Sequence, residues 1–226
     1  MRLLRRAGAL VLVLAVLDVF YLAWIWPDWE TLARGPAPKS SFIESYEASL
    51  ARGDDIPPLR WTPVPLSRIS RPMQRAVVVA EDARFFEHEG VDLEAVRDAW
   101  DENVEQGRIV LGGSTISQQT AKNLFLSPAR TPWRKWHELV LTFAMERHLE
   151  KERILELYLN VAQFGEGVFG VEAAARHYWG TSAANLSPRQ AAELAASLPS
   201  PVKHNPSTRT ARFERRARKV ARWLGS

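Results

Sequence analysis

The sequence contains no cysteine, which excludes a disulfide framework and any metal site built from thiolates. The absence does not exclude an exported protein, because cysteine-free extracytoplasmic proteins are common. The sequence also shows no internal repeat, no low-complexity tract and no convincing long strand. A repeat architecture is therefore not expected.

The composition indicates one globular domain with a basic charge balance. A chain of 226 residues with 46% hydrophobic and 25% charged residues can supply one sizeable core and a small appendage. The formal net charge of +4 favours an anionic partner, and it does not choose among lipid head groups, nucleic acid and pyrophosphate.

The N-terminal region predicts a membrane anchor. Residues 1–8 carry three arginines and precede an apolar run over 9–26. Eighteen helical residues extend roughly 27 Å, just enough to cross a hydrocarbon core. Asp18 interrupts the run at a cost of about 2.5–3.5 kcal/mol, which the surrounding apolar residues outweigh. We expect a single-pass helix in the cytoplasmic (inner) membrane, with 1–8 inside and all that follows outside; a cleaved signal peptide is the alternative. Asp18 either contacts a partner helix or is simply tolerated.

Composition then divides the rest of the chain into three parts. Residues 27–65 are rich in proline and predict a stalk with short elements, one of them a helix over 41–50, which can pack on the domain that follows. Residues 66–206 form the main domain. Residues 207–226 predict a basic amphipathic helix, with six arginines and Lys219 against Glu214. This helix either lies on anionic lipid or caps the domain with its arginines in water.

The most particular stretch of the sequence is 111–123, which reads LGGSTISQQTAKN. Gly112 and Gly113 permit a close approach of a ligand, and Ser114 is a helix-capping residue. Helical spacing then places four polar side chains near one face, beside the N–H groups of a helix N-terminus that can bind phosphate. These four are Thr115, Gln118, Gln119 and Lys122. A solvated surface helix is the ordinary alternative.

Two further polar motifs contain carboxylates. The first follows a predicted helix that starts near Pro72 and reads Glu81-Asp82-x-x-Phe85-x-x-His88-x-Gly90. Glu81 and Asp82 are adjacent, so on a helix they cannot point into the same space. Surface acidity is the ordinary reading of such a pair.

The second carboxylate motif lies on a helix predicted to start at 131–132. This helix has an apolar stripe that we expect to face the core, formed by Trp136, Val140, Phe143 and Ala144. On another face, Arg134 and Lys135 precede Glu138 by four and three residues, a spacing that also suits an ordinary surface ion pair.

These three motifs, in this order and spacing, resemble those of the peptidoglycan glycosyltransferases of family 51, which polymerise lipid II. Residues 151–160 and 164–180 are similar to the family's fourth and fifth motifs, with an apolar helical face in the fourth that indicates packing. Two departures are mild: Trp179 stands where phenylalanine is usual, and Ser117 stands where threonine is more common. The resemblance covers about 66–206.

The resemblance implies a mainly α, lysozyme-like domain and an inverting glycosyl transfer. Glu81 would be the general base that deprotonates the acceptor's 4-hydroxyl, and Glu138 would assist the departing pyrophosphate, directly or through a divalent cation such as Mg²⁺. The donor would be a nascent glycan on undecaprenyl pyrophosphate and the acceptor lipid II, at a membrane and without nucleic acid. The implied substrate-binding residues are Asp82, Phe85, His88, Ser114, Thr115, Gln118, Gln119, Lys122, Arg130, Arg134 and Lys135.

The sequence predicts an enzyme without a transpeptidase domain. Ser200-x-x-Lys203 matches a serine–lysine pattern, but a proline lies inside it and no K-T-G occurs anywhere. Two other hypotheses remain. A glycan-cleaving enzyme of lysozyme-like fold would use a glutamate but not the phosphate-binding cations, and a membrane-tethered binding module in a wall-building complex would need neither carboxylate.

Overall fold

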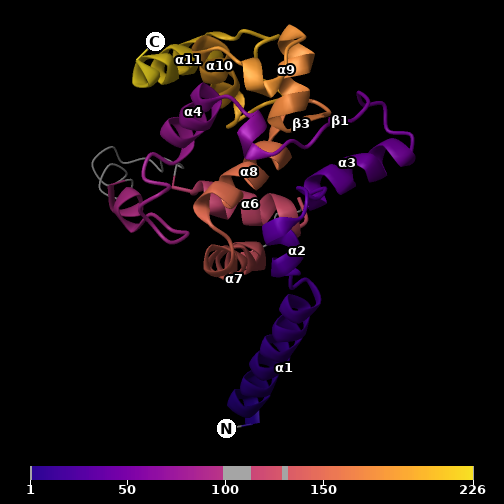
Figure 1. Cartoon of the computed structure of the whole chain (residues 1–226). Helices are drawn as coiled ribbons and strands as arrows, with labels where there is room; N and C mark the ends of the chain where they lie inside the picture. The colour runs from indigo at the N-terminus through magenta and orange to yellow at the C-terminus, as the bar shows by residue number, and fades with distance from the viewer. Residues whose placement is uncertain (1, 99–112, 129–131, 226) are drawn as a thin grey trace.

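The computed structural model describes residues 2–98, 113–128 and 132–225. Its elements are mainly helices, as predicted, and Figure 1 shows α1 projecting from one end of the molecule and α11 covering the other. The helices are α1 (Arg2–Trp24), α2 (Trp29–Arg34), α3 (Ser41–Ala51), α4 (Arg71–Glu81), α6 (Ile116–Phe125), α7 (Pro132–His148), α8 (Lys151–Val161), α9 (Val171–Trp179), α10 (Pro188–Ser197) and α11 (Ala211–Leu224). Residues 93–98 are also helical.

Helix α8 lies at the centre of the core. Its apolar face is buried as predicted, and Leu157, Asn160 and Val161 are buried as well. Helix α8 packs against α6 and α7, while α4, α10 and α11 pack on one another above them. Because α4 and α6 both contact this core, the two helices that carry Glu81 and Lys122 are held in a fixed relation.

Three short strands complete the core. They are β1 (Arg60–Trp61), β2 (Gln163–Gly165) and β3 (Val168–Phe169), in the order β1-β3-β2. Strand β3 pairs parallel with β1, in the register Arg60 to Val168, and antiparallel with β2. Gly170 ends β3 with a φ of 78°, and a side chain there would meet the Asn160 carbonyl oxygen at 2.8 Å, so only glycine fits.

The sequence signals for helix starts are mostly confirmed. Ser70 caps α4 and Pro72 lies in its first turn, while Ser187 and Gln190 form a capping box on α10. The start of α6 differs by one residue from the prediction. Thr115 caps this helix, with Gln118 completing a capping box, so the prediction that Ser114 caps it was wrong.

The segment predicted as a stalk packs on the domain. The Trp29 ring stacks on that of His148 at 5.2 Å, and Ser41 Oγ donates to the Leu124 carbonyl at 3.0 Å. Arg153 donates to the carbonyls of Leu32 and Gly35 at 2.8 Å and 2.7 Å. Helices α2 and α3 are the short elements that the proline content allows.

Helix α1 coincides with the apolar N-terminal run, but the prediction of a membrane-spanning helix over 9–26 is not supported. Among residues 2–98, 113–128 and 132–225, no helix is both long and apolar enough to cross a membrane. The helix starts at Arg2, and its first turns include Arg5 and Arg6, which are exposed.

Asp18 has partners within the chain. One of its carboxylate oxygens lies 2.5 Å from His137 Nε2, and the other accepts from Trp136 Nε1 at 3.2 Å. Both partners are on α7, so α1 contacts the domain through a polar pair. The prediction of an apolar, core-facing stripe on α7 is partly wrong. Trp136 and Phe143 are half exposed. The helix instead buries His137, Glu138, Leu141, Thr142 and Met145.

Asn160 provides a test of how the core holds the segment before α4. Its fully buried amide accepts from Val64 N–H at 2.8 Å and donates to the Val64 carbonyl at 2.9 Å. We expect Asn160→Leu to lower the free energy of unfolding by about 2–4 kcal/mol, because buried backbone groups lose their partners. Urea unfolding of the detergent-solubilised chain measures the change.

Asn160→Asp is the matched control for this substitution. It keeps the acceptor for Val64 N–H and loses the donor, so its loss of stability should lie between those of the wild type and Asn160→Leu. Equal stability of all three proteins would contradict the role given to this amide.

Candidate active site

Glu81 is the last residue of α4, and its carboxylate is nearly buried, with 11% of the side chain exposed. One oxygen accepts from Gln119 Nε2 at 3.1 Å. The other accepts from Arg216 Nη2 at 2.7 Å, and the same nitrogen donates to the Ala80 carbonyl at 3.2 Å. Three helices, α4, α6 and α11, therefore meet at this carboxylate.

Burial raises the pKa of Glu81 above its ordinary value. The Gln119 hydrogen bond and the Arg216 guanidinium act in the opposite direction, and the neighbouring Asp82 raises the pKa slightly further. A carboxylate whose pKa is raised towards neutrality is a better proton acceptor at physiological pH than an exposed one. This environment suits a general base.

Asp82 points away from Glu81, as expected for adjacent residues at a helix end. Its carboxylate accepts from Ile116 N–H at 2.9 Å and lies 3.0 Å from His88 Nε2. His88 Nδ1 accepts from Gly90 N–H at 3.1 Å, so Nε2 carries the proton that faces Asp82. Asp82 and His88 thus join the end of α4 to the start of α6.

The start of α6 is satisfied by protein groups. Ile116 N–H binds Asp82, and Gln118 N–H binds Thr115 Oγ1 at 3.1 Å. Thr115 and Gln118 are both buried, and Thr115 Oγ1 donates to the Gly90 carbonyl at 2.6 Å. At the helix N-terminus predicted to bind phosphate, two of the N–H groups therefore already have protein partners.

Gln119 is the residue of α6 that reaches Glu81. Tyr158 OH donates to Gln119 Oε1 at 3.1 Å, which orients the amide so that its nitrogen faces Glu81 and the Ser114 carbonyl. Burial raises the pKa of Tyr158 well above its ordinary value, so the phenol stays protonated and remains a donor. Phe85, by contrast, is fully buried under Lys151, whose Nζ lies 4.6 Å from the ring centroid.

Lys122 lies one helical turn beyond Gln119 and is partly buried. Burial lowers its pKa, and the charges of Arg134 and Lys135 lower it further. Glu138 and Glu81 oppose this effect, so Lys122 lies within electrostatic reach of both carboxylates. It also lines a cavity of about 150 Å³ with Gln119, Tyr158 and Phe42.

Glu138 lies on α7 with only 6% of its side chain exposed, and Lys135 Nζ binds its Oε1 at 2.6 Å. Arg134 is half-buried on the same helix, and Arg130 lies outside the described residues. In the described part of the chain, no group of three or more His, Cys, Asp or Glu side chains is placed to hold a metal ion. A cation at Glu138 would need most of its ligands from substrate and water, which is usual for Mg²⁺.

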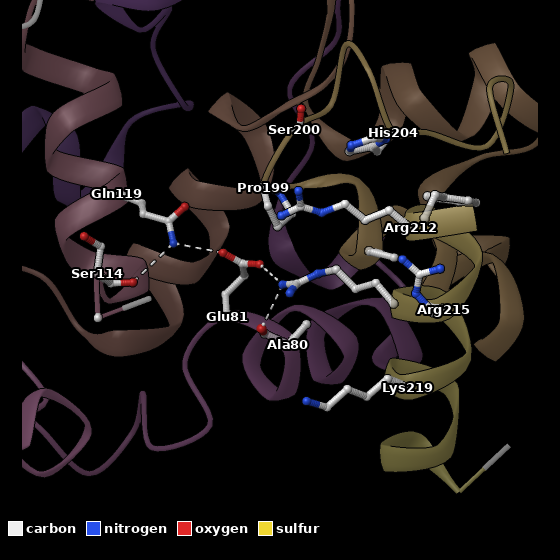
Figure 2. Close-up of a pocket in the computed structure, with 14 residues that line it drawn as sticks. Ala80, Glu81, Ser114, Gln119, Pro199, Ser200, His204, Arg212, Arg215 and Lys219 are labelled. Atoms are coloured by element: carbon white, nitrogen blue, oxygen red, sulfur yellow. Dashed lines mark hydrogen bonds and ion pairs between the residues drawn. The ribbon is translucent and has the colours of Figure 1, made fainter. Parts of the chain in front are cut away.

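A cavity of about 690 Å³ opens beside Glu81. Figure 2 shows Glu81, Gln119 and Ser114 on one side and residues of α11 and of the 199–204 loop on the other. Gln119 borders this cavity and the smaller one at Lys122. Gln119 therefore lies between the cavity at Glu81 and the cavity at Lys122.

Two residues of this site were missed by sequence reasoning. Arg216 was one of six arginines in a basic helix, and nothing in the local pattern distinguished it from the others. Tyr158 was placed on a packing face, which is correct, but its hydroxyl reaches Gln119. A tyrosine among leucines on a buried helix was the one available signal, because a buried phenol usually has a hydrogen-bond partner.

A helical domain with a buried carboxylate at a helix end, facing a cavity and a set of cations, defines a glycosyl-transferring class of site. The model of the transglycosylase family matches residues 54–224. The chain belongs to the transglycosylase family. The match includes α11 as well as the motifs.

Curated relatives extend the similarity over nearly the whole chain. The chain is 47% identical over 194 residues to a biosynthetic peptidoglycan transglycosylase of Laribacter hongkongensis, covering 84% of each chain. It is 48% identical over 191 residues to that of Methylobacillus flagellatus, covering 84% of this chain and 83% of the relative. It is 45% identical over 228 residues to that of Bordetella avium, covering 96% of this chain and 95% of the relative.

The Arg216 contact predicts a measurable titration. Removing a cation that lies 2.7 Å from a carboxylate removes an effect that lowers its pKa. We expect Arg216→Gln to raise the pKa of Glu81 further above its ordinary value, measured by ¹³C NMR of the labelled carboxylate. Arg218→Gln, on the same helix but paired with Glu214, is the control and should leave the pKa unchanged. A lower or unaltered pKa of Glu81 in Arg216→Gln would refute the conclusion that Arg216 lowers this pKa.

Proposed function

We propose that the chain polymerises lipid II into peptidoglycan glycan strands by inverting glycosyl transfer. The single observation that supports this most directly is the nearly buried Glu81 carboxylate with a raised pKa, bordering the large cavity and in electrostatic reach of Lys122. The helical domain also suits the lysozyme-like fold that the sequence motifs imply.

Glu81 acts on the acceptor. The 4-hydroxyl of lipid II enters the large cavity and donates its proton to Glu81, and the oxygen attacks the anomeric carbon of the donor. One C–O bond forms there while the bond from that carbon to the lipid pyrophosphate breaks on the opposite face, which inverts the configuration. Gln119, held by Tyr158, orients the carboxylate for this transfer.

The leaving pyrophosphate lies on the side of Lys122. Lys122, Arg134 and Lys135 present cations around Glu138, and cations of this kind pair with phosphate oxygens. Arg130 would join them by the resemblance. Two N–H groups at the start of α6 already bind protein groups, so we assign phosphate binding to side chains.

Asp82, Phe85, His88, Thr115 and Gln118 receive supporting roles. Four of them are buried and His88 is nearly so; the polar ones hydrogen-bond to one another or to the backbone, Phe85 packs beside His88, and together they hold the junction between α4 and α6. Ser114 is exposed and lines the large cavity, so it remains available to contact the acceptor sugar.

A divalent cation, Mg²⁺ above all, fits one position. Glu138 would supply one carboxylate oxygen, and Mg²⁺ commonly combines one or two carboxylates with substrate phosphates and water. When bound, such an ion would offset the charge of the departing pyrophosphate. Lys135, which already neutralises Glu138, can give part of the same effect without metal.

We place the enzyme at the extracytoplasmic face of the cytoplasmic membrane, with α1 in contact with lipid. Large apolar side chains on α1 are exposed, among them Leu10, Val13 and Leu17. Trp133, Trp136 and Phe143 are exposed on α7, the helix that α1 contacts. Lipid-linked substrates enter most directly at this end of the molecule, shown with α1 and α7 in Figure 1.

The general-base assignment predicts a loss of turnover without a loss of binding. We expect Glu81→Gln to lower the rate of polymerisation at least about 100-fold, because a positioned base contributes 10²–10⁴-fold. Its affinity for a labelled lipid-linked glycan donor should stay within about twofold. Lys122→Ala should instead weaken donor binding about tenfold, the loss of one charge-assisted contact.

The assay uses purified, detergent-solubilised protein with labelled lipid II, with and without Mg²⁺, and separates products by size. Lys39→Ala, at an exposed lysine just before α3 that pairs with Glu47, is the control for Lys122→Ala. Appreciable polymer from Glu81→Gln would end the assignment of Glu81. Unchanged lipid II with the wild type would favour a binding module, and release of fragments from preformed glycan would favour a cleaving enzyme.

Lipid contact through α1 predicts retention on vesicles. Full-length protein should float with liposomes, and replacing Leu10, Val13 and Leu17 together by Asn should reduce flotation about tenfold or more, because apolar burial drives the association. High salt should not release the wild type. Flotation that the triple substitution leaves intact, or that salt abolishes, would contradict an apolar contact.

A further inference from the structure

The cavity beside Glu81 has a second basic wall that the polymerisation mechanism does not use. Three cations of α11, Arg212, Arg215 and Lys219, line it together with Arg216. Their spacing of three and four residues places them on one helical face. In Figure 2, Arg212 and Lys219 extend from α11 towards the side of the cavity where Glu81 lies.

Among the described residues of this region, Arg212, Arg215, Lys219 and Arg222 have no acid partner, unlike three other arginines. Arg209 pairs with Glu193 and Glu214, Arg218 pairs with Glu214, and Arg216 pairs with Glu81. Among the described residues, no acid pairs with Arg212, Arg215 or Lys219, and all three are exposed. Like charges gathered on one helical face repel one another, so their arrangement favours an anionic ligand.

The packing of α11 restricts where that ligand binds. Phe213, Ala217 and Val220 are buried, and the helix packs on α4 and α10. These three apolar residues are therefore covered by the domain and do not contact lipid, while Trp223 near the end of the helix is half exposed. The basic face borders the cavity that contains Glu81, at the end of the molecule opposite α1 (Figure 1).

We propose that Arg212, Arg215 and Lys219 of α11 form an anion-binding subsite for the acceptor substrate. The inference rests on the proposed function, in which Glu81 acts on the acceptor and the cations of α6 and α7 bind the donor. The acceptor carries two kinds of anion near its sugars, the carboxylates of the stem peptide and the pyrophosphate. Clustered guanidinium and ammonium groups bind carboxylates and pyrophosphate by the same charge-assisted hydrogen bonds.

The test compares two double substitutions with equal charge loss on one helix. Arg212→Gln with Lys219→Gln removes two cations from the cavity, whereas Arg218→Gln with Arg222→Gln removes two that do not line it. Arg215 is left unchanged so that each pair removes two charges, and Lys219, Arg218 and Arg222 all line a neighbouring surface hollow, so that hollow loses cations in both pairs. Binding of fluorescent lipid II in detergent micelles is measured by anisotropy, which needs no turnover.

We expect the cavity pair to weaken lipid II binding about tenfold, and the control pair to change it less than about twofold. In elongation assays with a fixed lipid-linked glycan donor, the cavity pair should raise the KM for lipid II and leave kcat within about twofold. Equal effects of the two pairs, or no effect of either, would overturn the subsite.

A lipid-linked disaccharide without the stem peptide separates the two anion sources. If the cavity pair no longer affects binding of this ligand, the subsite holds the peptide carboxylates; if the tenfold loss persists, it holds the pyrophosphate. Polymer formation by the wild type tests the proposed function separately. A wild type that binds lipid II through the cavity pair but makes no polymer would keep the subsite and reject the transferase.

Discussion

The site depends on the contact between Asp82 and the first turn of α6. Asp82 follows Glu81 directly, and its carboxylate takes the Ile116 N–H and the His88 ring. This buried contact connects the end of α4 to the start of α6 across 34 residues of sequence, so Glu81 and Gln119 come to lie side by side. Breaking a buried, hydrogen-bonded carboxylate contact is costly. Asp82 is therefore held in a structural role, whereas the adjacent Glu81 borders the cavity.

Helix α11 imposes the second constraint on Glu81. Burial alone would raise the pKa of this carboxylate further, but Arg216 and Gln119 hold it back. The net effect is a pKa above the ordinary value, which makes this carboxylate a stronger base than an exposed glutamate. The C-terminal helix is therefore part of the site, although it lies about 135 residues from Glu81 in the sequence.

Sequence reasoning predicted the helices well because their signals are local. The starts of α4 near Pro72 and of α7 at Pro132, and the apolar period of α8, depend only on near neighbours. The mistakes came from tertiary contacts. Asp82 accepts a hydrogen bond from the first turn of α6, where a phosphate was expected. Trp136, expected in the core, instead contacts Asp18 of α1. Arg216 was missed because only the packing of α11 on α4 and α10 selects it from five other arginines.

Cations line two separate parts of the site. Lys122, Arg134 and Lys135 surround Glu138 on α6 and α7, and a separate set lines the α11 wall. Gln119 borders both cavities, and Glu81 lies beside it. A reaction that joins two anionic, lipid-linked sugars requires a cation set for each and a proton acceptor between them. In this chain the proton acceptor is Glu81, which is held at the end of α4 and by the Gln119 amide. The two basic regions lie on different sides of this carboxylate.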